Sequence, residues 1–277
     1  IEPNPTTDMV AEGAALAVKE GCDAVIGLGG GSPMDAAKAI AVAAGNGRDI
    51  WDYREDIDAS KTLPIVVIPT TAGSGTDGDR YFVVTNESLN FKEGFGTDFT
   101  YPQITIMDPE LTLDLPEDVT KDTALDALGH SLEAFISNGD ANAFSNMISL
   151  DSVRLIFDYL PKAVKNGKDI QARSALMLAA TMGGIAINHG GVCAPHGISM
   201  AIGGLYNTTH GQGIGIILPY AIEKAMDNLK DRLGFAVRFL NMSSSQDDVE
   251  CSKIFVDRLH QFVEDLGYPR KLSQIGI

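Results

Sequence analysis

The stretch Asp23–Ala41, DAVIGLGGGSPMDAAKAIA, passes from an apolar segment through three consecutive glycines into an alanine-rich segment. The apolar segment is typical of a buried strand, and the residues from Pro33 to about Ala44 are typical of a helix. A strand that passes through a short glycine turn into a helix is the repeating unit of a parallel, doubly wound sheet. This stretch therefore predicts an α/β domain.

The same alternation continues on both sides of this stretch. A helix is expected at about Asp8–Glu20, with Thr6 or Thr7 as its N-cap. Further strands are expected at Pro64–Pro69, Arg80–Thr85 and Gln103–Asp108.

After Pro116 the pattern becomes helical up to the end of the chain. The expected helices are at about Glu117–Ser137, Ala143–Asn166, Ile170–Ile187, Ile216–Met226, Leu229–Leu240 and Asp247–Leu266. The sequence thus predicts an α/β nucleotide-binding domain over residues 1–112, an all-helical metal- and substrate-binding domain over residues 113–277, and a cleft between them.

The composition is that of a globular protein and excludes several classes of partner. The 277 residues include 37 Asp and Glu against 21 Lys and Arg, a net charge of -16. A surface this acidic repels nucleic acid and anionic lipid, and no apolar run looks long enough to span a bilayer. The three cysteines are sparse and form no CxxC pair, which favours reduced thiols and a cytoplasmic protein. Because the chain opens on Ile1 and stops without a closing element, we expect parts of the N-terminal domain and of the C-terminus to be missing.

The glycine loop suits an anion. Glycines at Gly29–Gly31 let the backbone approach a ligand closely, because no Cβ stands in the way. Ser32 suits the N-cap, Pro33 the first helical position and Asp35 the acid of a capping box. Free amides at this helix start fit a pyrophosphate. The pattern is neither GxGxxG nor a P-loop, so a plain connecting turn remains the alternative.

A second loop, PTTAGSGTD at Pro69–Asp77, follows the next buried strand and is rich in hydroxyl groups. Loops at the carboxyl ends of strands line the ligand crevice of a doubly wound sheet. Together the two loops favour a cradle for a phosphate and a ribose, with an ordinary surface turn as the alternative.

An aspartate and three histidines form a candidate metal site. Asp126 and His130 lie four residues apart in LDALGHSLEAF, so their side chains leave the same face of a helix. His196 begins HGISMAIGGLYN, and His210 follows fourteen residues later. Such a set suits a divalent ion such as Fe²⁺ or Zn²⁺. Each histidine alone could be an isolated residue, but glycine-rich, nearly uncharged segments are unusual places for solvated histidines.

At this level of detail the chain resembles a known family. The motifs GGGSPMDAAKAIA, PTTAGSGTD, DALGHSLEAF and HGISMAIGGLYNTTHG occur in the order found in the iron-containing (group III) alcohol dehydrogenases. The resemblance spans essentially the whole chain, and the last two motifs together are the specific ones. It implies a dehydroquinate synthase-like architecture and hydride transfer between NAD or NADP and a small alcohol or aldehyde. It is compatible with a homo-oligomer.

The resemblance also assigns site residues, although it assigns no catalytic residue. The implied ligands of Fe²⁺, with Zn²⁺ as the alternative ion, are Asp126, His130, His196 and His210. The residues implied to bind the dinucleotide are Gly29, Gly30, Gly31, Ser32, Asp35, Thr70, Thr71, Ser74 and Lys92.

Two positions depart from the family pattern. Where the family has a further histidine one turn after the ligand matched by His196, this chain has Met200, which cannot relay a proton. His189 is the spare histidine that could replace it. Where the family has an apolar residue and then Thr, this chain has Gly78 and Asp79. We expect the Asp79 carboxylate to lie close to the cofactor phosphates and to weaken cofactor binding.

The sequence leaves the choice of cofactor and two other functions open. The residue that discriminates NAD from NADP lies, in the family, on strands that precede PNPT, so this choice cannot be made here. A lyase of the dehydroquinate synthase type would need several Lys and Arg for an anionic substrate, and few occur near the candidate ligands. A catalytically silent relative is the other alternative, suggested by Met200 and Asp79. Apolar residues at Met200, Ile202 and Leu205 favour a small, uncharged substrate.

Overall fold

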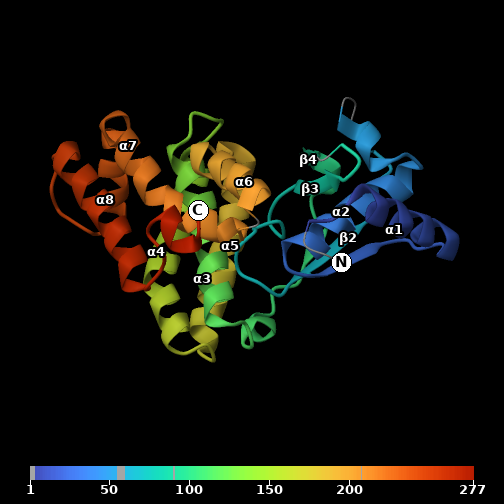
Figure 1. Ribbon diagram of the computed structural model, residues 1–277, viewed down its shortest axis with the longest axis horizontal. Helices are drawn as coiled ribbons and strands as arrows, with labels where there is room; N and C mark the ends of the chain where they lie inside the picture. Colours follow the sequence, from blue (N-terminus) through green and yellow to red (C-terminus); the bar gives the residue numbers. More distant parts are fainter. Residues whose placement is uncertain (1–3, 55–59, 90, 207) are drawn as a thin grey trace.

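The computed structural model describes residues 4–54, 60–89, 91–206 and 208–277. An α/β part formed by the first segments of the chain lies beside a bundle of helices formed by the rest (Figure 1), and the backbone tube traces the same two parts. Both parts of the predicted fold class are therefore confirmed.

The α/β part is built on a small parallel sheet. Its helices are α1 (Thr7–Glu20) and α2 (Gly31–Asn46), and its strands are β1 (Val25–Gly29), β2 (Ile65–Pro69) and β5 (Ile104–Thr105). The strand order is β1-β2-β5, with β2 in the centre. Val25 pairs with Ile65 and Val66 with Ile104, both in parallel register. Met34 of α2 packs with Ile65 and Val67 in the core of this part. Since β1 ends at Gly29 and α2 begins at Gly31, the start of the helix lies directly beyond the carboxyl end of the strand.

A separate antiparallel hairpin corrects part of the strand prediction. It consists of β3 (Tyr81–Asn86) and β4 (Phe91–Gly96). The predicted strand at Arg80–Thr85 exists but pairs in this hairpin, because alternate residues are buried as in a two-faced antiparallel strand. The segment Gln103–Asp108 forms only the two-residue strand β5. β4 was not predicted, since FKEGFG shows little of the alternation that marks a strand.

The start of α2 differs from the expected cap. Thr6 caps α1 as one of the two expected residues, but the N-cap of α2 is Gly30, and no described side chain caps this helix. The assignments of Ser32 as N-cap and Asp35 as capping-box acid are wrong. The helix begins two residues earlier than expected, at Gly31, where a Cβ would lie 3.1 Å from the Cβ of Ser74. The amides of its first turn are therefore left for a ligand.

The helical part contains the largest core. Its helices are α3 (Glu117–Ile136), α4 (Ala143–Lys165), α5 (Ile170–Gly190), α6 (Ala194–Tyr206), α7 (His210–Phe239) and α8 (Asp248–Asp265). Buried Leu128, Leu150 and Phe255 represent this core. α6 was not predicted, and α7 is one helix where two were expected. Both features were missed because the glycines in these segments disfavour a helix prediction. The close packing nevertheless requires glycine, since a Cβ at Gly211 would lie 2.0 Å from the Asp122 carbonyl oxygen.

α5 meets the length and apolar composition of a membrane span, which the sequence was not expected to contain. It packs against α3 and α4, and 56% of its apolar window is buried. This is the position of a core helix.

Candidate active site

Three helices bring acidic and imidazole groups to one point. Asp126 comes from α3, His196 from α6 and His210 from α7. The potential ligand atoms of these three residues all lie within 4.8 Å of one another. Asp126 Oδ1 lies 3.7 Å from His196 Nε2 and 3.5 Å from His210 Nε2. The carboxylate therefore faces both imidazoles.

His130, the fourth expected ligand, lies beside this group without joining it. Its ring centroid is 4.6 Å from that of His196, and the side chain is 7% exposed. Its Nδ1 is buried and has no hydrogen-bond partner among the described residues. The structure thus brings three of the four expected ligands together and places the fourth in contact with them.

The donor atoms fit a cation. Asp126 Oδ1 and His196 Nε2 are buried and, within the described ranges, have no hydrogen-bond partner. Buried polar atoms normally have partners, because an unsatisfied one costs about 1–3 kcal/mol. Orphaned acceptors that converge on one point are what a divalent metal site requires, and carboxylate with imidazole suits Fe²⁺ and Zn²⁺.

Two residues missed in the sequence orient these donors. Glu133 is fully buried, and its Oε1 accepts a hydrogen bond of 2.5 Å from His196 Nδ1. This bond holds a proton on Nδ1, so Nε2, which faces Asp126, is the ring atom left to bind a cation. Ser199 Oγ donates to the His210 carbonyl oxygen at 2.9 Å and lies 3.3 Å from His210 Nδ1. Glu133 could have been found in the sequence, because it lies three residues after His130 and is the only acidic residue between His130 and the end of α3.

Burial and the neighbouring charges shift the pKa values of the site in different directions. Burial lowers the pKa of His130 to about 4, against the attraction of Asp126. Burial also lowers the pKa of His196, but the neighbouring carboxylates of Asp126 and Glu133 raise it more, to about 9, and a bound cation would displace the proton on Nε2. Burial raises the pKa of Asp126, and the three imidazoles lower it more, to well below its usual value. Asp126 is therefore ionised at neutral pH.

A cleft joins this group to the glycine loop. Its volume is about 280 Å³, and both parts of the chain contribute to its walls. The lining residues are Gly30, Gly31, Thr71, Ser74, Val119, Asp122, Thr123, Asp126, Thr209, His210 and Gly211. A Cβ on Gly30 would lie 3.4 Å from Thr71 Oγ1, and one on Gly31 3.1 Å from the Cβ of Ser74. Glycine therefore keeps the approach to the uncapped amides of α2 open, as a phosphate requires.

The other expected dinucleotide residues lie behind this cleft within the described ranges. Gly29 accepts a hydrogen bond from the amide of Thr70 at 2.8 Å. Asn4, missed in the sequence, donates its backbone N–H to Ser32 Oγ at 3.1 Å, and its side-chain Oδ1 accepts from Lys92 Nζ at 2.6 Å. Lys92 is thereby tied to the glycine loop.

Asp35 holds the hairpin in place. Its Oδ1 accepts from Thr76 Oγ1 at 2.7 Å, and its Oδ2 accepts from the amide of Val83 at 3.0 Å. Burial raises its pKa, mainly against the attraction of Lys38. Asp35 thus connects α2 with β3, in contrast to the direct contact with a ligand expected for it.

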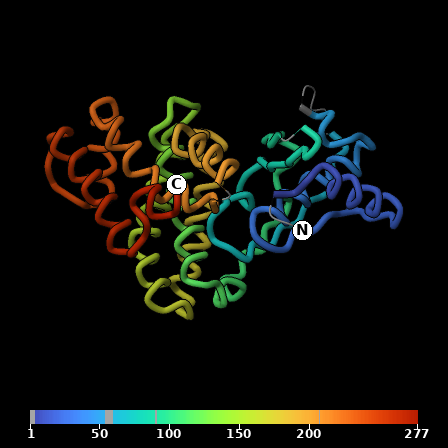
Figure 2. The backbone as a smooth tube through the Cα atoms, viewed as in Figure 1, coloured from blue at the N-terminus to red at the C-terminus, as the bar shows by residue number. Residues whose placement is uncertain are grey.

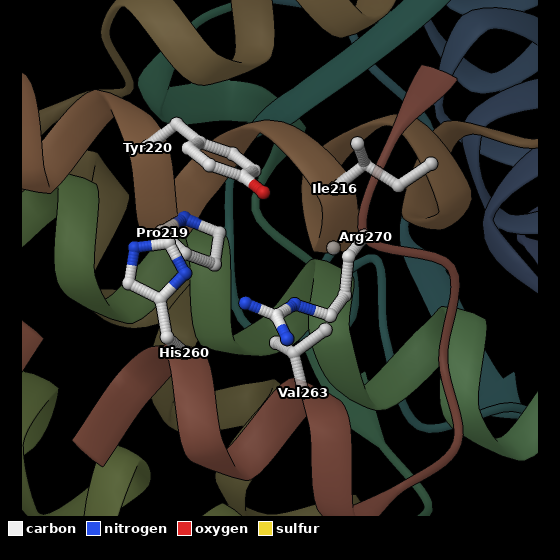
Figure 3. Close-up of a pocket in the computed structure, with 7 residues that line it drawn as sticks. Ile216, Pro219, Tyr220, His260, Val263 and Arg270 are labelled. Atoms are coloured by element: carbon white, nitrogen blue, oxygen red, sulfur yellow. The ribbon is translucent and has the colours of Figure 1, made fainter. Parts of the chain in front are cut away.

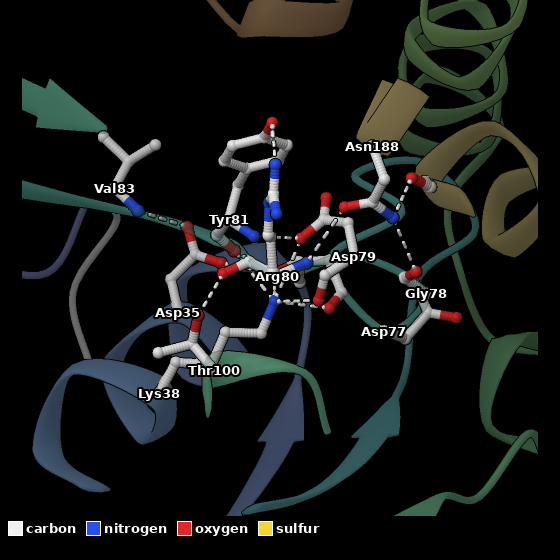
Figure 4. A network of polar contacts seen from close by, with 12 residues as sticks. Asp35, Lys38, Asp77, Gly78, Asp79, Arg80, Tyr81, Val83, Thr100 and Asn188 are labelled. Carbon is white, nitrogen blue, oxygen red and sulfur yellow. Dashed lines mark hydrogen bonds and ion pairs between the residues drawn. The ribbon is translucent and has the colours of Figure 1, made fainter. Parts of the chain in front are cut away.

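A buried lysine overturns the expectation for Asp79. The Lys38 side chain is fully buried, and its Nζ lies 3.0 Å from Asp79 Oδ1 (Figure 4). The same ammonium donates to the carbonyl oxygens of Thr76, Asp79 and Tyr81. Burial raises the pKa of Asp79 to about 7, against the attraction of Lys38. The carboxylate is buried against its own counter-ion and is not among the described residues that line the cleft, which contradicts the expectation that it lies close to the cofactor phosphates.

Neither Met200 nor its suggested substitute reaches the described wall of the cleft. Met200 lies on α6 one turn after His196 and is 45% exposed. His189 is exposed near the end of α5. The suggestion that His189 replaces the missing histidine therefore gains no support from its position.

A second, smaller hollow lies between α7 and α8, lined by Tyr220, His260 and Arg270 (Figure 3). Its two basic groups already have partners. His260 Nε2 lies 3.0 Å from Glu223, and Arg270 Nη1 lies 2.9 Å from Glu264. The larger cleft is therefore the candidate active site.

Comparison with known proteins identifies the family. The model described as iron-containing alcohol dehydrogenase matches residues 1–109, and the model of the C-terminal part of the Fe-containing alcohol dehydrogenase family matches residues 120–277. An NAD-dependent methanol dehydrogenase of Bacillus methanolicus is 33% identical over 279 residues, which cover 100% of this chain and 73% of that protein.

Solved structures agree. The crystal structure of a 1,3-propanediol oxidoreductase matches with a TM-score of 0.94 and 29% identity, covering 100% of this chain and 73% of the other. That of a sulfoacetaldehyde reductase from Bifidobacterium kashiwanohense in complex with NAD⁺ matches with a TM-score of 0.91 and 29% identity, covering 100% and 72%. On these matches over its full length, the chain belongs to the iron-containing alcohol dehydrogenase family.

Proposed function

We propose that this chain catalyses hydride transfer between NAD or NADP and a small alcohol or aldehyde at a divalent metal ion. The observation that carries the proposal is the cleft that places the uncapped start of α2 opposite Asp126 and His210. A dinucleotide with its pyrophosphate at the glycine loop can reach a substrate held at the other wall. Relatives named as alcohol-oxidising enzymes, one of them NAD-dependent, support the same reaction.

The chain's own residues have distinct tasks in this proposal. Asp126, His196 and His210 would hold the ion, with His130 as the fourth ligand. Such an ion, when bound, polarises the substrate oxygen. Glu133 keeps the His196 proton on Nδ1, away from the ion. The first-turn amides of α2 bind the pyrophosphate, and the hydroxyls of Thr71 and Ser74 donate to phosphate or ribose oxygens.

Among the alternatives, the geometry favours the dehydrogenase. No Lys or Arg of the described ranges lines the cleft, while Asp122 and Asp126 do. A lyase of the dehydroquinate synthase type must hold an anionic substrate, which two carboxylates repel. The three unpaired cysteines are consistent with the proposed cytoplasmic location.

One experiment separates the dehydrogenase from a silent relative. The purified protein is analysed for metal and then assayed by absorbance for oxidation of simple alcohols with NAD⁺ and NADP⁺, with Fe²⁺ or Zn²⁺ restored. We expect one ion per chain and turnover with at least one of the two cofactors. Metal binding without turnover on any simple alcohol or aldehyde would contradict the proposal and favour the silent relative.

Replacing Glu133 by glutamine is expected to weaken metal binding by about 10- to 100-fold, the usual effect of losing a carboxylate that supports a ligand. The amide can still accept from His196 Nδ1 but carries no charge. Affinity is measured by competition with a chelator. Glu223→Gln, which changes an exposed carboxylate outside the cleft, is the matched control. Equal affinity in native protein and Glu133→Gln would exclude this role.

Met200→His is expected to leave the metal content unchanged, because Met200 is not among the candidate ligands. An imidazole one turn after His196 supplies a titratable proton. Since Met200 does not line the described part of the cleft, this imidazole is expected to leave the rate of alcohol oxidation and its pH profile unchanged, whereas a faster rate or a new ionisation near ~6.5 would show that the position reaches the reacting groups. If rate and profile both match those of the native enzyme, the absent histidine has no effect on proton transfer here.

A further inference from the structure

A second carboxylate lines the active-site cleft. Asp122 lies on α3 four residues before Asp126, and both residues line the same cleft. Positions four apart follow one another on the same face of a helix, about 6 Å along its axis. Asp122 therefore stands about one helical turn from the point where Asp126 meets the imidazoles of His196 and His210.

Two hydroxyl groups from distant elements hold this carboxylate in place. The Tyr268 hydroxyl donates to Asp122 Oδ1, and Thr209 Oγ1 donates to Asp122 Oδ2 at 2.6 Å. Burial, followed by the bond to Asp122, raises the pKa of Tyr268, so the phenol stays protonated and keeps donating. Each carboxylate oxygen has a second lone pair, which can accept a bond from a ligand.

The charge of Asp122 has no described cation beside it. Neither Lys nor Arg lines the cleft in the described part of the chain, and the partners of Asp122 are neutral hydroxyls. Asp126, in contrast, faces the imidazoles. The charge of Asp126 thus serves the candidate metal site, while that of Asp122 remains to act on a substrate.

We propose that Asp122 determines specificity, favouring short amino alcohols whose ammonium group lies two or three carbons beyond the reacting hydroxyl. This inference rests on the proposed function. With the reacting oxygen near Asp126, a few C–C bonds of about 1.5 Å bring the ammonium to Asp122. A neutral alcohol of equal length gains no charged hydrogen bond there, and an anionic alcohol is repelled. The inference keeps the small size expected from the sequence but replaces the expected uncharged substrate by one with a cationic end.

The test compares three substrates of similar length: 3-amino-1-propanol, 1-butanol and 3-hydroxypropanoate. kcat/KM is measured for each in native enzyme, in Asp122→Asn and in Asp227→Asn, which changes an exposed carboxylate on α7. The native enzyme should prefer the amino alcohol to 1-butanol. Asp122→Asn should lower this preference by about tenfold or more, mainly through KM, while Asp227→Asn should not change it. The variant should also relax the rejection of 3-hydroxypropanoate.

A second variant tests the hydrogen bonds that position the Asp122 carboxylate. Tyr268→Phe keeps the charge and removes one hydroxyl, so the preference should fall by less than in Asp122→Asn. It also provides a test if Asp122→Asn fails to fold. A native enzyme that oxidises 1-butanol as well as the amino alcohol, or variants that leave the preference unchanged, would overturn the inference while the proposed function stands. Absence of turnover on all three substrates would instead contradict the proposed function itself.

Discussion

Replacing His210 by alanine is expected to remove most of the bound metal and to lower kcat/KM for alcohol oxidation by about a thousandfold. His210 supplies one of the two imidazoles that meet Asp126, and its Nε2 lies 3.5 Å from the carboxylate. A metal ion contributes several kcal/mol of charge stabilisation to such reactions, and each 1.36 kcal/mol is a tenfold change in rate. Metal content is measured on the purified protein after dialysis, and activity in the presence of restored metal.

The matched control is His260→Ala. His260 pairs with Glu223 between α7 and α8, outside the cleft, so this variant should keep its metal and its activity. His130→Ala completes the series, because it decides whether the site has three or four ligands. Full metal occupancy in His210→Ala would exclude this histidine as a ligand, whatever its activity. Full occupancy in His130→Ala alone would reduce the site to the three residues that the structure brings together.

Spacing within one helix predicted more of the site than spacing between helices. Asp126 and His130 could be placed on one face because both lie on α3, four residues apart. His196 and His210 meet Asp126 only because α6 and α7 pack as a helical pair, and glycines hid both the whole of α6 and the start of α7. These glycines are required by packing: a Cβ on Gly213 would lie 2.2 Å from Ser199 Oγ. A single sequence shows the glycine but not the neighbour that requires it.

Contacts between residues far apart in the chain could not be predicted from the sequence for the same reason. Nothing in the sequence around Asp122 marks it as a site residue, because its hydrogen-bond donor, Tyr268, lies 146 positions away. The expectation that Asp79 would lie close to cofactor phosphates failed because its counter-ion, Lys38, lies 41 positions earlier in the chain, and their pairing cannot be read from local spacing. Glu133 differs: it was missed, although its spacing from His130 within α3 could have placed it at the site.

Lys38→Met is expected to lower the free energy of unfolding by about 3–5 kcal/mol, the usual cost of leaving one partner of a buried ion pair without the other. The ammonium is fully buried and satisfies Asp79 and three backbone carbonyl oxygens. Unfolding in urea, followed by circular dichroism, measures the change. Lys165→Met, which changes an exposed lysine at the end of α4, should alter stability by less than about 0.5 kcal/mol. The double variant Lys38→Met with Asp79→Leu should recover part of the loss, since neither charge then remains buried.

The pH dependence of the stability of Asp79→Asn tests the contribution of Asp79, the other partner of this ion pair. Burial raises the pKa of Asp79 to about 7 in the folded protein, from its usual value of 3.8. Between these values the folded state binds a proton that the unfolded state does not, so the contribution of Asp79 to stability is full below pH ~4 and is lost as pH rises through ~7. Stability of the native protein should therefore fall more steeply over this range than that of Asp79→Asn, which has no proton to lose. Parallel pH profiles for the two proteins would mean that Lys38 keeps Asp79 ionised throughout, and the loss in Lys38→Met would then reflect an unpaired carboxylate alone.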